Sequence, residues 1–343
     1  MSTTLFFLLA VFPMAASWAG TGLFRRHARA SQWLDLPTAR SSHTVPTPRG
    51  GGVAIVASSL LWVTALGLAG WIESLLCVAI VGSGLLVASL GFLDDRRNLP
   101  ARWRFLGHAA AAIWVLYWLG SVPSVPVFGV VIDLSYAGPV LCGLYVVWMV
   151  NLFNFMDGID GIASVEAITT TLSGALLWWL AGSGTGWSVA LLFAACVAGF
   201  LIWNFPPAKI FMGDAGSGFL GLMVALLSLW CGRSTPALFW SWFILIGFFM
   251  VDATTTLVRR VRRGERFFEA HRAHAYQYAA RRVGGHLAVT LACGVINVFW
   301  LLPMAAAVAM GRLDGLLGVA LAYAPLVWLA FRYKAGDRGA QEV

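Results

Sequence analysis

Charged residues are scarce in this chain of 343 amino acids. Asp, Glu, Lys and Arg together make up 11% of it, whereas hydrophobic residues make up 59% and the mean hydropathy is +0.80. A soluble domain carries about 25% charged residues, so the composition excludes an ordinary soluble protein. The 17 Trp and 22 Phe are typical of membrane spans and of the aromatic belts at their ends. The sequence therefore predicts an integral membrane protein.

Several short motifs are also missing. The phosphate-binding loop GxxxxGK[ST] is absent. The cysteines lie in apolar runs without CxxC or CxH spacing, which argues against a metal centre or a disulfide framework. No internal repeat, low-complexity segment or linker divides the chain, so we expect one domain over residues 1–343. No basic residue precedes the first apolar run, and Arg25, Arg26 and Arg29 follow it, which favours a retained helix over a cleaved signal peptide.

Eleven apolar runs are long enough to cross a membrane as tilted helices. They cover residues 4–24, 51–70, 74–93, 105–121, 138–156, 163–181, 187–203, 218–232, 237–258, 287–309 and 315–331. We thus expect an all-α, multi-pass membrane protein. The segment 121–137 alternates apolar and polar residues around Gly129 and predicts a small hairpin.

Basic residues lie almost entirely in alternate connections between these runs. The connections 25–50, 94–104, 157–162, 204–217 and 259–286 and the tail 332–343 contain 21 of the 23 Lys and Arg residues. This bias predicts a periplasmic N-terminus, a cytoplasmic C-terminus and an active site in cytoplasmic loops. It also explains most of the net charge of +8 without a nucleic-acid partner.

Four of these connections carry unusual polar residues. In "GFLDDRRNLPARWR", Asp94 and Asp95 are adjacent, and neighbouring carboxylates repel unless an arginine or a cation compensates. In "NLFNFMDGIDGIAS", Asn151, Asn154 and Asp157 share one helix face, and Asp160 follows between glycines that let the backbone leave the helix. A solvated loop with local ion pairs and a polar helix end are the simpler explanations of these two segments.

The other two segments lie later in the chain. "NFPPAKIFMGDAGSGFLG" contains Asn204, Lys209 as its one base, and Asp214 just before a helix, where backbone N–H groups can bind phosphate; a plain helix cap is the alternative. The loop 259–286 includes Arg260, and the spacing of His271, Arg272 and His274 in it could serve an anionic ligand or a metal. Two histidines with no nearby cysteine are a weak signal for zinc. Positive charge against anionic headgroups explains many of its arginines, but not the interleaved aromatic residues Phe267, Phe268 and Tyr276.

Together these loops suit Mg²⁺ and a diphosphate, because carboxylate and amide oxygens bind the metal and Arg and His bind phosphate. Two other classes are considered. A transporter would place ionisable residues within its spans, but the candidates there are only Glu166 and Asp252 and no inverted repeat is present. A non-catalytic protein that only binds a phosphorylated ligand is disfavoured, because carboxylates at a membrane face are costly without a metal or a ligand.

The same segments resemble a known family. "DLPTARSSHTVPTPRGGGVAI", "DDRRNLPARWRFLGH", "NLFNFMDGIDGIA", "NFPPAKIFMGDAGSGFLG" and the "HRAH" loop are similar to those of the polyprenyl-phosphate N-acetylhexosamine-1-phosphate transferases. That group includes the transferases that initiate O-antigen and enterobacterial common antigen, and the phospho-MurNAc-pentapeptide transferase. The resemblance implies transfer of a sugar-1-phosphate from a UDP-sugar to undecaprenyl phosphate, with release of UMP. Whether the protein forms a homodimer is left open.

The resemblance also implies roles for individual residues. It places Asp214 on Mg²⁺ (or Mn²⁺), with Asn154 able to join it, and it places Asp94 and Asp95 beside the lipid phosphate. Asp157, Asp160 and Asn204 would line the nucleotide side. We count Asp94, Asp95, Asp157 and Asp160 as catalytic and Asn151, Asn204, Lys209, Arg260, His271, Arg272 and His274 as substrate-binding.

One departure from the family pattern concerns the sugar. Relatives that use UDP-N-acetylglucosamine often read DRxHxHH in the last loop, whereas this chain reads "HRAHAYQ". His271 replaces the aspartate, and Tyr276 and Gln277 replace the last two histidines. The loop looks more like that of transferases for 6-deoxy sugars such as N-acetylfucosamine or N-acetylquinovosamine. We expect Tyr276 and Gln277 to affect the choice of sugar.

Overall fold

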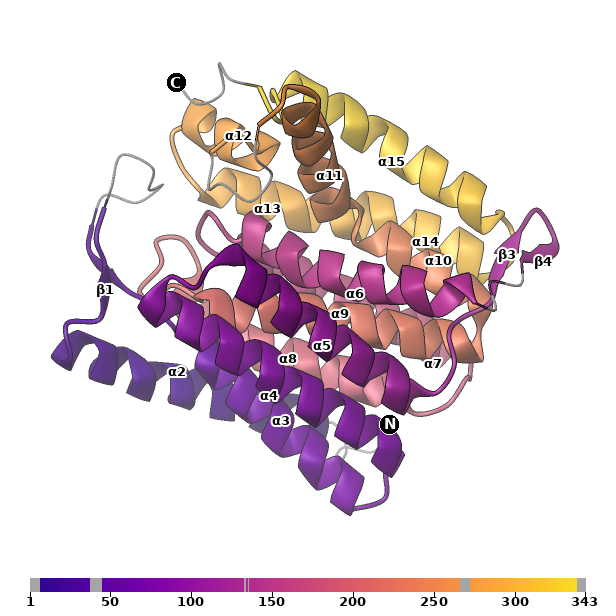
Figure 1. Ribbon diagram of the computed structural model, residues 1–343, viewed down its shortest axis with the longest axis horizontal. Coiled ribbons are helices and arrows are strands. Elements are labelled where there is room, and N and C mark those ends of the chain that lie inside the picture. Colours follow the sequence, from indigo (N-terminus) through magenta and orange to yellow (C-terminus); the bar gives the residue numbers. More distant parts are fainter. Residues whose placement is uncertain (1–6, 38–44, 133, 135, 266–271, 338–343) are drawn as a thin grey trace.

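The computed structural model describes residues 7–37, 45–132, 134, 136–265 and 272–337. Helices dominate these residues, with two short hairpins (Figure 1). The elements in chain order are η1 (Phe7–Val11), α2 (Phe12–Ala30), β1 (Leu34–Asp35), β2 (Thr47–Pro48), α3 (Gly52–Leu68), α4 (Ser74–Arg97), α5 (Ala101–Leu119), β3 (Val125–Val127), β4 (Val130–Ile132), α6 (Ala137–Met156), α7 (Ile162–Leu180), α8 (Gly186–Asn204), α9 (Asp214–Ser234), α10 (Pro236–Leu245), α11 (Gly247–Arg262), α12 (Ala275–Val283), α13 (Leu287–Ile296), η2 (Asn297–Leu301), α14 (Leu302–Ala309) and α15 (Gly315–Arg332).

Helix α9 forms the centre of the bundle. It packs against α3, α4, α6, α7 and α10. The apolar 18-residue stretch that makes α9 long enough to span a membrane is completely buried. Gly221 permits this packing, because a Cβ atom there would lie 2.1 Å from the backbone oxygen of Met149 on α6. Small residues make the apolar run of this segment short in the sequence. In the structure, the same residues let the neighbouring helices approach closely.

The expected apolar runs coincide with helices throughout the described residues. Seven helices are long and apolar enough to cross a membrane, or up to eight if one bent pair forms a single span. These findings confirm an all-α, multi-pass membrane protein, while the number eleven and the orientation stay predictions. The expectation of one helix over 237–258 was wrong, because α10 and α11 meet at Ile246 with a bend of 68°. Hydropathy reports the length of an apolar run but not its straightness.

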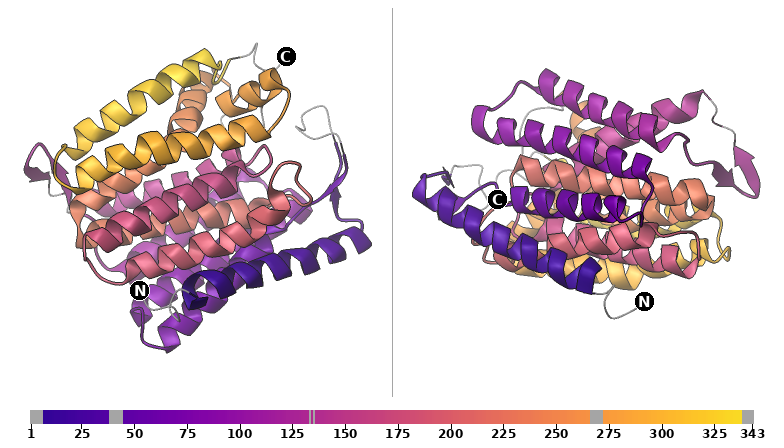
Figure 2. Two further views of the ribbon diagram at one scale, coloured as in Figure 1. Left: turned by 180° about the vertical axis from the view of Figure 1, so that it is seen from behind. Right: turned by 90° about the horizontal axis from the view of Figure 1, so that it is seen from below.

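The hairpin predicted between residues 121 and 137 is present. Strands β3 and β4 pair in antiparallel register, with Val127 opposite Val130. The hairpin and the chain segments that carry the four polar motifs lie at opposite ends of the bundle (Figures 1 and 2). Strands β1 and β2 form a second small hairpin at the motif end, where Leu34 pairs with Pro48. The fold therefore gathers the predicted chemistry at one end.

Candidate active site

The two adjacent aspartates at the end of α4 face the first turn of α9. Both oxygens of Asp95 accept the backbone N–H of Asp214, at 3.1 and 2.9 Å, and the Asp95 side chain is completely buried. One turn earlier, Gly91 allows the close approach of the two helices, because a Cβ atom there would lie 2.5 Å from the backbone oxygen of Asp214. Asp95 therefore caps the N-terminus of α9, where a carboxylate is stabilising.

Arg49 links the carboxylates of Asp95 and Asp214. One of its terminal nitrogens lies 2.7 Å from Oδ1 of Asp95 and 2.7 Å from Oδ1 of Asp214. Burial alone would lower the pKa of the Arg49 guanidinium, but Asp214 and Asp95 outweigh it and raise the pKa above its ordinary value. The glycines after Arg49 donate backbone hydrogen bonds to the oxygens of Phe211 and Met212, which fasten this loop to the turn before α9.

Asp94 points to a different environment from that of Asp95. Its carboxylate accepts from Nη1 of Arg104 at 3.0 Å and from the backbone N–H of Leu99 at 2.6 Å. Asp94, Arg104 and His108 line a small pocket together with Asn151, Asn154 and Asp214. The pocket lies between α4, α5, α6 and α9, so segments 120 positions apart in the sequence meet in it.

The predicted polar face of α6 is confirmed as a structural feature. Asn151 lies 3.3 Å from Nδ1 of His108, and Nδ2 of Asn154 donates to Oγ of Ser217 in the first turn of α9, at 3.2 Å. The Asn154 side chain is also in hydrogen-bonding reach of the Asp214 carboxylate. The amides of Asn151 and Asn154 therefore lie beside Asp94 and Asp214, which together with Asp95 we call the acidic cluster. The spacing of three residues predicted that the two amides share one helix face.

Asp157 follows the last residue of α6 and ends that helix. Loss of hydration raises the pKa of its carboxyl well above the usual value, and the charges of Asp214, Asp95 and Asp160 add to the shift, while Arg49 opposes it. Burial is therefore the main cause of the raised pKa, and the nearby carboxylates add negative charge that a cation would relieve.

Asp160 and Asn204 hold two loops together. Oδ2 of Asp160 accepts the backbone N–H of Ala208 at 3.0 Å and lies 3.2 Å from Nδ1 of His286. The buried Asn204 amide accepts from the backbone N–H of Gly161 and donates to the backbone oxygen of Ile210, both at 3.0 Å. Through these hydrogen bonds, Asp160 and Asn204 position the two loops. Contact of either residue with a nucleotide stays a prediction.

The last loop is anchored by a buried carboxylate on α11. Asp252 accepts the backbone N–H groups of Ala275 and Tyr276 at 3.0 and 2.9 Å, and lies 3.2 Å from Nδ1 of His274. The Tyr276 hydroxyl donates to the backbone oxygen of Phe155 at 3.1 Å. The first turn of α12 therefore rests on the turn that carries Asp157, and Asp252 positions it there.

The remaining predicted substrate-binding residues have contacts with other parts of the protein. Arg260 is buried, and its Nε lies 2.9 Å from a carboxylate oxygen of Glu265. Lys209 is exposed, with its ammonium 5.8 Å from the centre of the Trp203 ring. Arg272 is half-buried beside α12, where its backbone oxygen accepts from Arg281. His271, Phe267 and Phe268 lie outside the described residues, and the substrate-binding roles stay predictions.

Sequence reasoning missed four residues at this site: Arg49, Arg104, His108 and His286. His108 carries a visible signal, because it is a lone polar residue in the apolar run of α5. Arg49 had a weaker one, a base directly before three glycines, of which the last begins α3. Neither signal names a partner, since the partners come from α4, α6 and α9.

The oxygen atoms at this site fit Mg²⁺ better than a soft metal. Asp94, Asp214 and Asn154 offer carboxylate and amide oxygens around one pocket, and a guanidinium cation already lies between Asp95 and Asp214. Among the described residues, no three or more His, Cys, Asp or Glu side chains form a complete metal cage. Mg²⁺ typically uses one or two carboxylates together with substrate phosphates and water, so the residues present fit it.

The different surroundings of Asp94 and Asp95 predict different mutant phenotypes. We expect Asp94→Asn to lower turnover and to destabilise the protein less than Asp95→Asn does, because the Asp94 carboxylate, although it accepts from Arg104 and Leu99, also faces the pocket. Asp95→Asn should lower turnover and also destabilise the protein by about 1–3 kcal/mol, because a buried acceptor of a backbone N–H and of Arg49 is weakened. Thermal unfolding in detergent, measured beside activity, checks this. Equal stability losses in both variants would contradict the assignment.

The chain is similar in sequence to known proteins. The family described as glycosyl transferase family 4 matches residues 75–232. The chain is 32% identical over 245 residues to a probable undecaprenyl-phosphate N-acetylglucosaminyl 1-phosphate transferase of Bacillus subtilis, covering 70% of this chain and 68% of the relative. It is 31% identical over 366 residues to a decaprenyl-phosphate N-acetylglucosaminephosphotransferase of Mycolicibacterium smegmatis, covering 95% and 88%. A phospho-N-acetylmuramoyl-pentapeptide-transferase of Moorella thermoacetica is 33% identical over 221 residues, covering 60% and 68%. The chain therefore belongs to glycosyl transferase family 4 and is a multi-pass membrane glycosyl-1-phosphate transferase.

Proposed function

We propose that the enzyme transfers an N-acetylhexosamine-1-phosphate from a UDP-sugar to undecaprenyl phosphate and releases UMP, in a bacterial inner membrane. The observation that carries the proposal is the cluster of Asp94, Asp95 and Asp214 with Arg49 and Arg104, at the end of the bundle where the basic loops lie. Such a site suits two phosphorylated substrates, because arginines neutralise phosphate oxygens and carboxylates recruit a metal. The names of the relatives above support a polyprenyl-phosphate acceptor.

We further propose that Mg²⁺, with Mn²⁺ as a substitute, is held by Asp214 and Asn154. When bound, it supplies positive charge to the diphosphate of the donor. Arg49 keeps the Asp214 carboxylate oriented, and Asp95 fixes the helix turn from which Asp214 projects. These contacts preorganise the site before substrates arrive, which is the main way that a protein accelerates phosphoryl transfer.

In this proposal, the nucleophile is an oxygen of the acceptor phosphate. A phosphate monoester is largely a dianion near pH 7, since its second pKa is about 6. Its oxygen forms a bond to the β-phosphorus of the donor, while the bond from that phosphorus to the bridging oxygen breaks and UMP leaves. A covalent aspartyl-phosphate is the alternative; the burial of Asp95 and the hydrogen bonds on Asp94 argue against it. Arg104 is placed to screen the incoming phosphate.

The donor sugar and the pathway belong to the proposal as well. The "HRAHAYQ" sequence favours a 6-deoxy-N-acetylhexosamine and initiation of O-antigen or a related surface polysaccharide, whereas the relatives' names favour N-acetylglucosamine. Tyr276 and Gln277 are buried and lie against Gly158, where a Cβ atom would be 2.2 Å from the Tyr276 hydroxyl. Their effect on the sugar would therefore act through the position of the Asp157 turn.

A panel of donors tests the function directly. The purified protein is incubated in detergent with undecaprenyl phosphate, Mg²⁺ and one UDP-sugar at a time, and the lipid product and UMP are measured by mass spectrometry. We expect a polyprenyl-diphosphate sugar with at least one N-acetylhexosamine donor, and none after chelation of the metal. Absence of a lipid-linked product with every donor would refute the proposal.

Orientation has its own test. With the active site in the cytoplasm, single cysteines at the exposed positions Ser234 and Arg312 should react with a membrane-impermeant thiol reagent in intact cells. A cysteine at Gly264, at the other end of the bundle, should react only after permeabilisation. The unmodified protein is the control, because its own cysteines are buried or half-buried. The reverse labelling pattern would invert the topology.

A further inference from the structure

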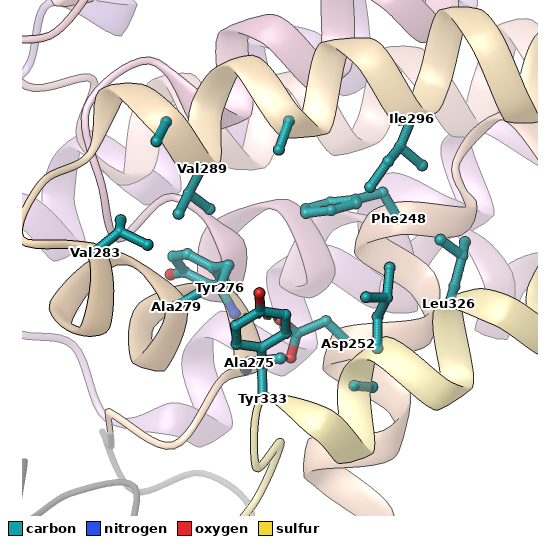
Figure 3. A pocket seen from close by; sticks show the side chains of 14 residues that line it. Phe248, Asp252, Ala275, Tyr276, Ala279, Val283, Val289, Ile296, Leu326 and Tyr333 are labelled. Atoms are coloured by element: carbon teal, nitrogen blue, oxygen red, sulfur yellow. Dashed lines mark hydrogen bonds between the residues drawn. The ribbon is translucent and has the colours of Figure 1, made fainter.

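A cavity of about 310 Å³ lies behind the last loop, outside the acidic site. Four helices line it, and side chains such as Phe248 on α11, Ala279 on α12, Val289 on α13 and Leu326 on α15 face it (Figure 3). The lining residues with polar side chains are Asp252, Tyr276 and Tyr333, and Asp252 already accepts hydrogen bonds from the first turn of α12. The cavity is therefore an apolar site, which we call the α13–α15 wedge.

The wedge opens because two spans diverge. Figure 1 shows α15 and the α13–α14 span close together near the β3–β4 hairpin and apart near α12. Helix α15 packs against α10, α11 and α14, and small residues on α13, Ala288 and Ala292, remain exposed toward the gap. Between two membrane spans, such an apolar gap is filled by hydrocarbon.

Positive charge surrounds the end of the wedge near α12. Arg282 is exposed and directly precedes Val283, a lining residue that is 54% exposed. On the helix, Arg282 is three residues after Ala279 and so borders the lining face. Lys334 follows the lining residue Tyr333, with its ammonium 5.2 Å from the Tyr278 ring centre. Basic residues beside an apolar pocket match an anionic headgroup above a hydrocarbon chain.

We propose that the wedge binds an acyl chain of an anionic phospholipid, with its phosphate near Arg282 and Lys334. The acceptor's own prenyl chain fits the observations less well. The pocket with Asp94 and Arg104 lies between α4, α5, α6 and α9 and shares no lining residue with the wedge. The bound lipid braces α12 from behind, while Tyr276 contacts the Asp157 turn in front.

Native mass spectrometry of the detergent-purified protein tests this without reference to activity. Phosphatidylglycerol, phosphatidylcholine and undecaprenyl phosphate are titrated separately. We expect the wild type to bind phosphatidylglycerol more tightly than phosphatidylcholine. Ala292→Trp should abolish this binding by filling the wedge. Leu291→Trp is the matched control and should bind normally, because Leu291 is exposed but does not line the wedge.

A second variant covers the case in which Ala292→Trp does not fold. Arg282→Gln changes an exposed side chain and should weaken phosphatidylglycerol binding by about fivefold, as expected for one arginine at an anionic surface. Equal affinity of the wild type for both phospholipids would overturn the proposal. So would unchanged binding in Arg282→Gln, or displacement of phosphatidylglycerol by undecaprenyl phosphate, which would assign the wedge to the acceptor. Because lipid binding is the readout, these outcomes are independent of whether the proposed transferase reaction is found.

Discussion

Asp214→Asn is expected to reduce turnover by more than about 100-fold while the protein remains folded. Loss of even an outer-shell partner of a metal typically costs about 10–100-fold, and Asp214 is the carboxylate that we place on the metal itself. Asparagine preserves the size of the side chain and can still accept a hydrogen bond from Arg49, which now lies 2.7 Å from the carboxylate. The change therefore removes mainly the negative charge that Mg²⁺ prefers in a ligand.

The measurement is the initial rate of UMP release as a function of Mg²⁺ concentration, together with thermal unfolding. Asp337→Asn is the matched control, because this carboxylate is 43% exposed and pairs with Arg259 outside the acidic cluster. We expect the control to behave as the wild type does. Wild-type rates for Asp214→Asn at limiting Mg²⁺ would remove Asp214 from the metal.

Arg49→Ala should cause a comparably large loss of turnover and, unlike Asp214→Asn, a loss of stability. Without Arg49, the buried carboxylate of Asp95 faces Asp214 with no cation between them. An unsatisfied buried group costs about 1–3 kcal/mol. We expect a loss of stability in that range and no larger, because the Arg49 side chain is 34% exposed and solvent already screens its charge. The rate should fall by about 100-fold or more, as when a preorganised charge-stabilising group is removed.

Three comparisons test this explanation. Arg49→Lys should recover part of the stability, because an ammonium supplies the charge but not the planar geometry of a guanidinium. Raised Mg²⁺ should also stabilise Arg49→Ala, because a cation can then screen the two carboxylates. Arg312→Ala, at the hairpin end of the bundle, should change neither property. Normal stability of Arg49→Ala in the absence of Mg²⁺ would show that the bridge between Asp95 and Asp214 does not support the fold.

Local features of the sequence are sufficient to predict the class of protein and the segments that form the site. Membrane spans are local: a run such as 74–93 is apolar enough to leave water wherever its neighbours lie, and the structure has a helix there. The three-residue spacing that sets Asn151 and Asn154 on one face is a property of any α-helix. Each family motif is a contiguous stretch of sequence, and the motifs follow one another along the chain in the order typical of the family. These features need no knowledge of packing.

Which polar residues contact one another depends on how distant segments pack together. Arg49 and Asp214 are 165 positions apart, and no local pattern distinguishes the buried Asp95 from the adjacent Asp94, because successive residues on a helix point in directions about 100° apart. The bend at Ile246 likewise turns α11 so that Asp252 meets the start of α12 rather than remaining a lone acid in a span. In each case the partner comes from a distant segment, so the energy of the contact exists only after the helices have packed around α9.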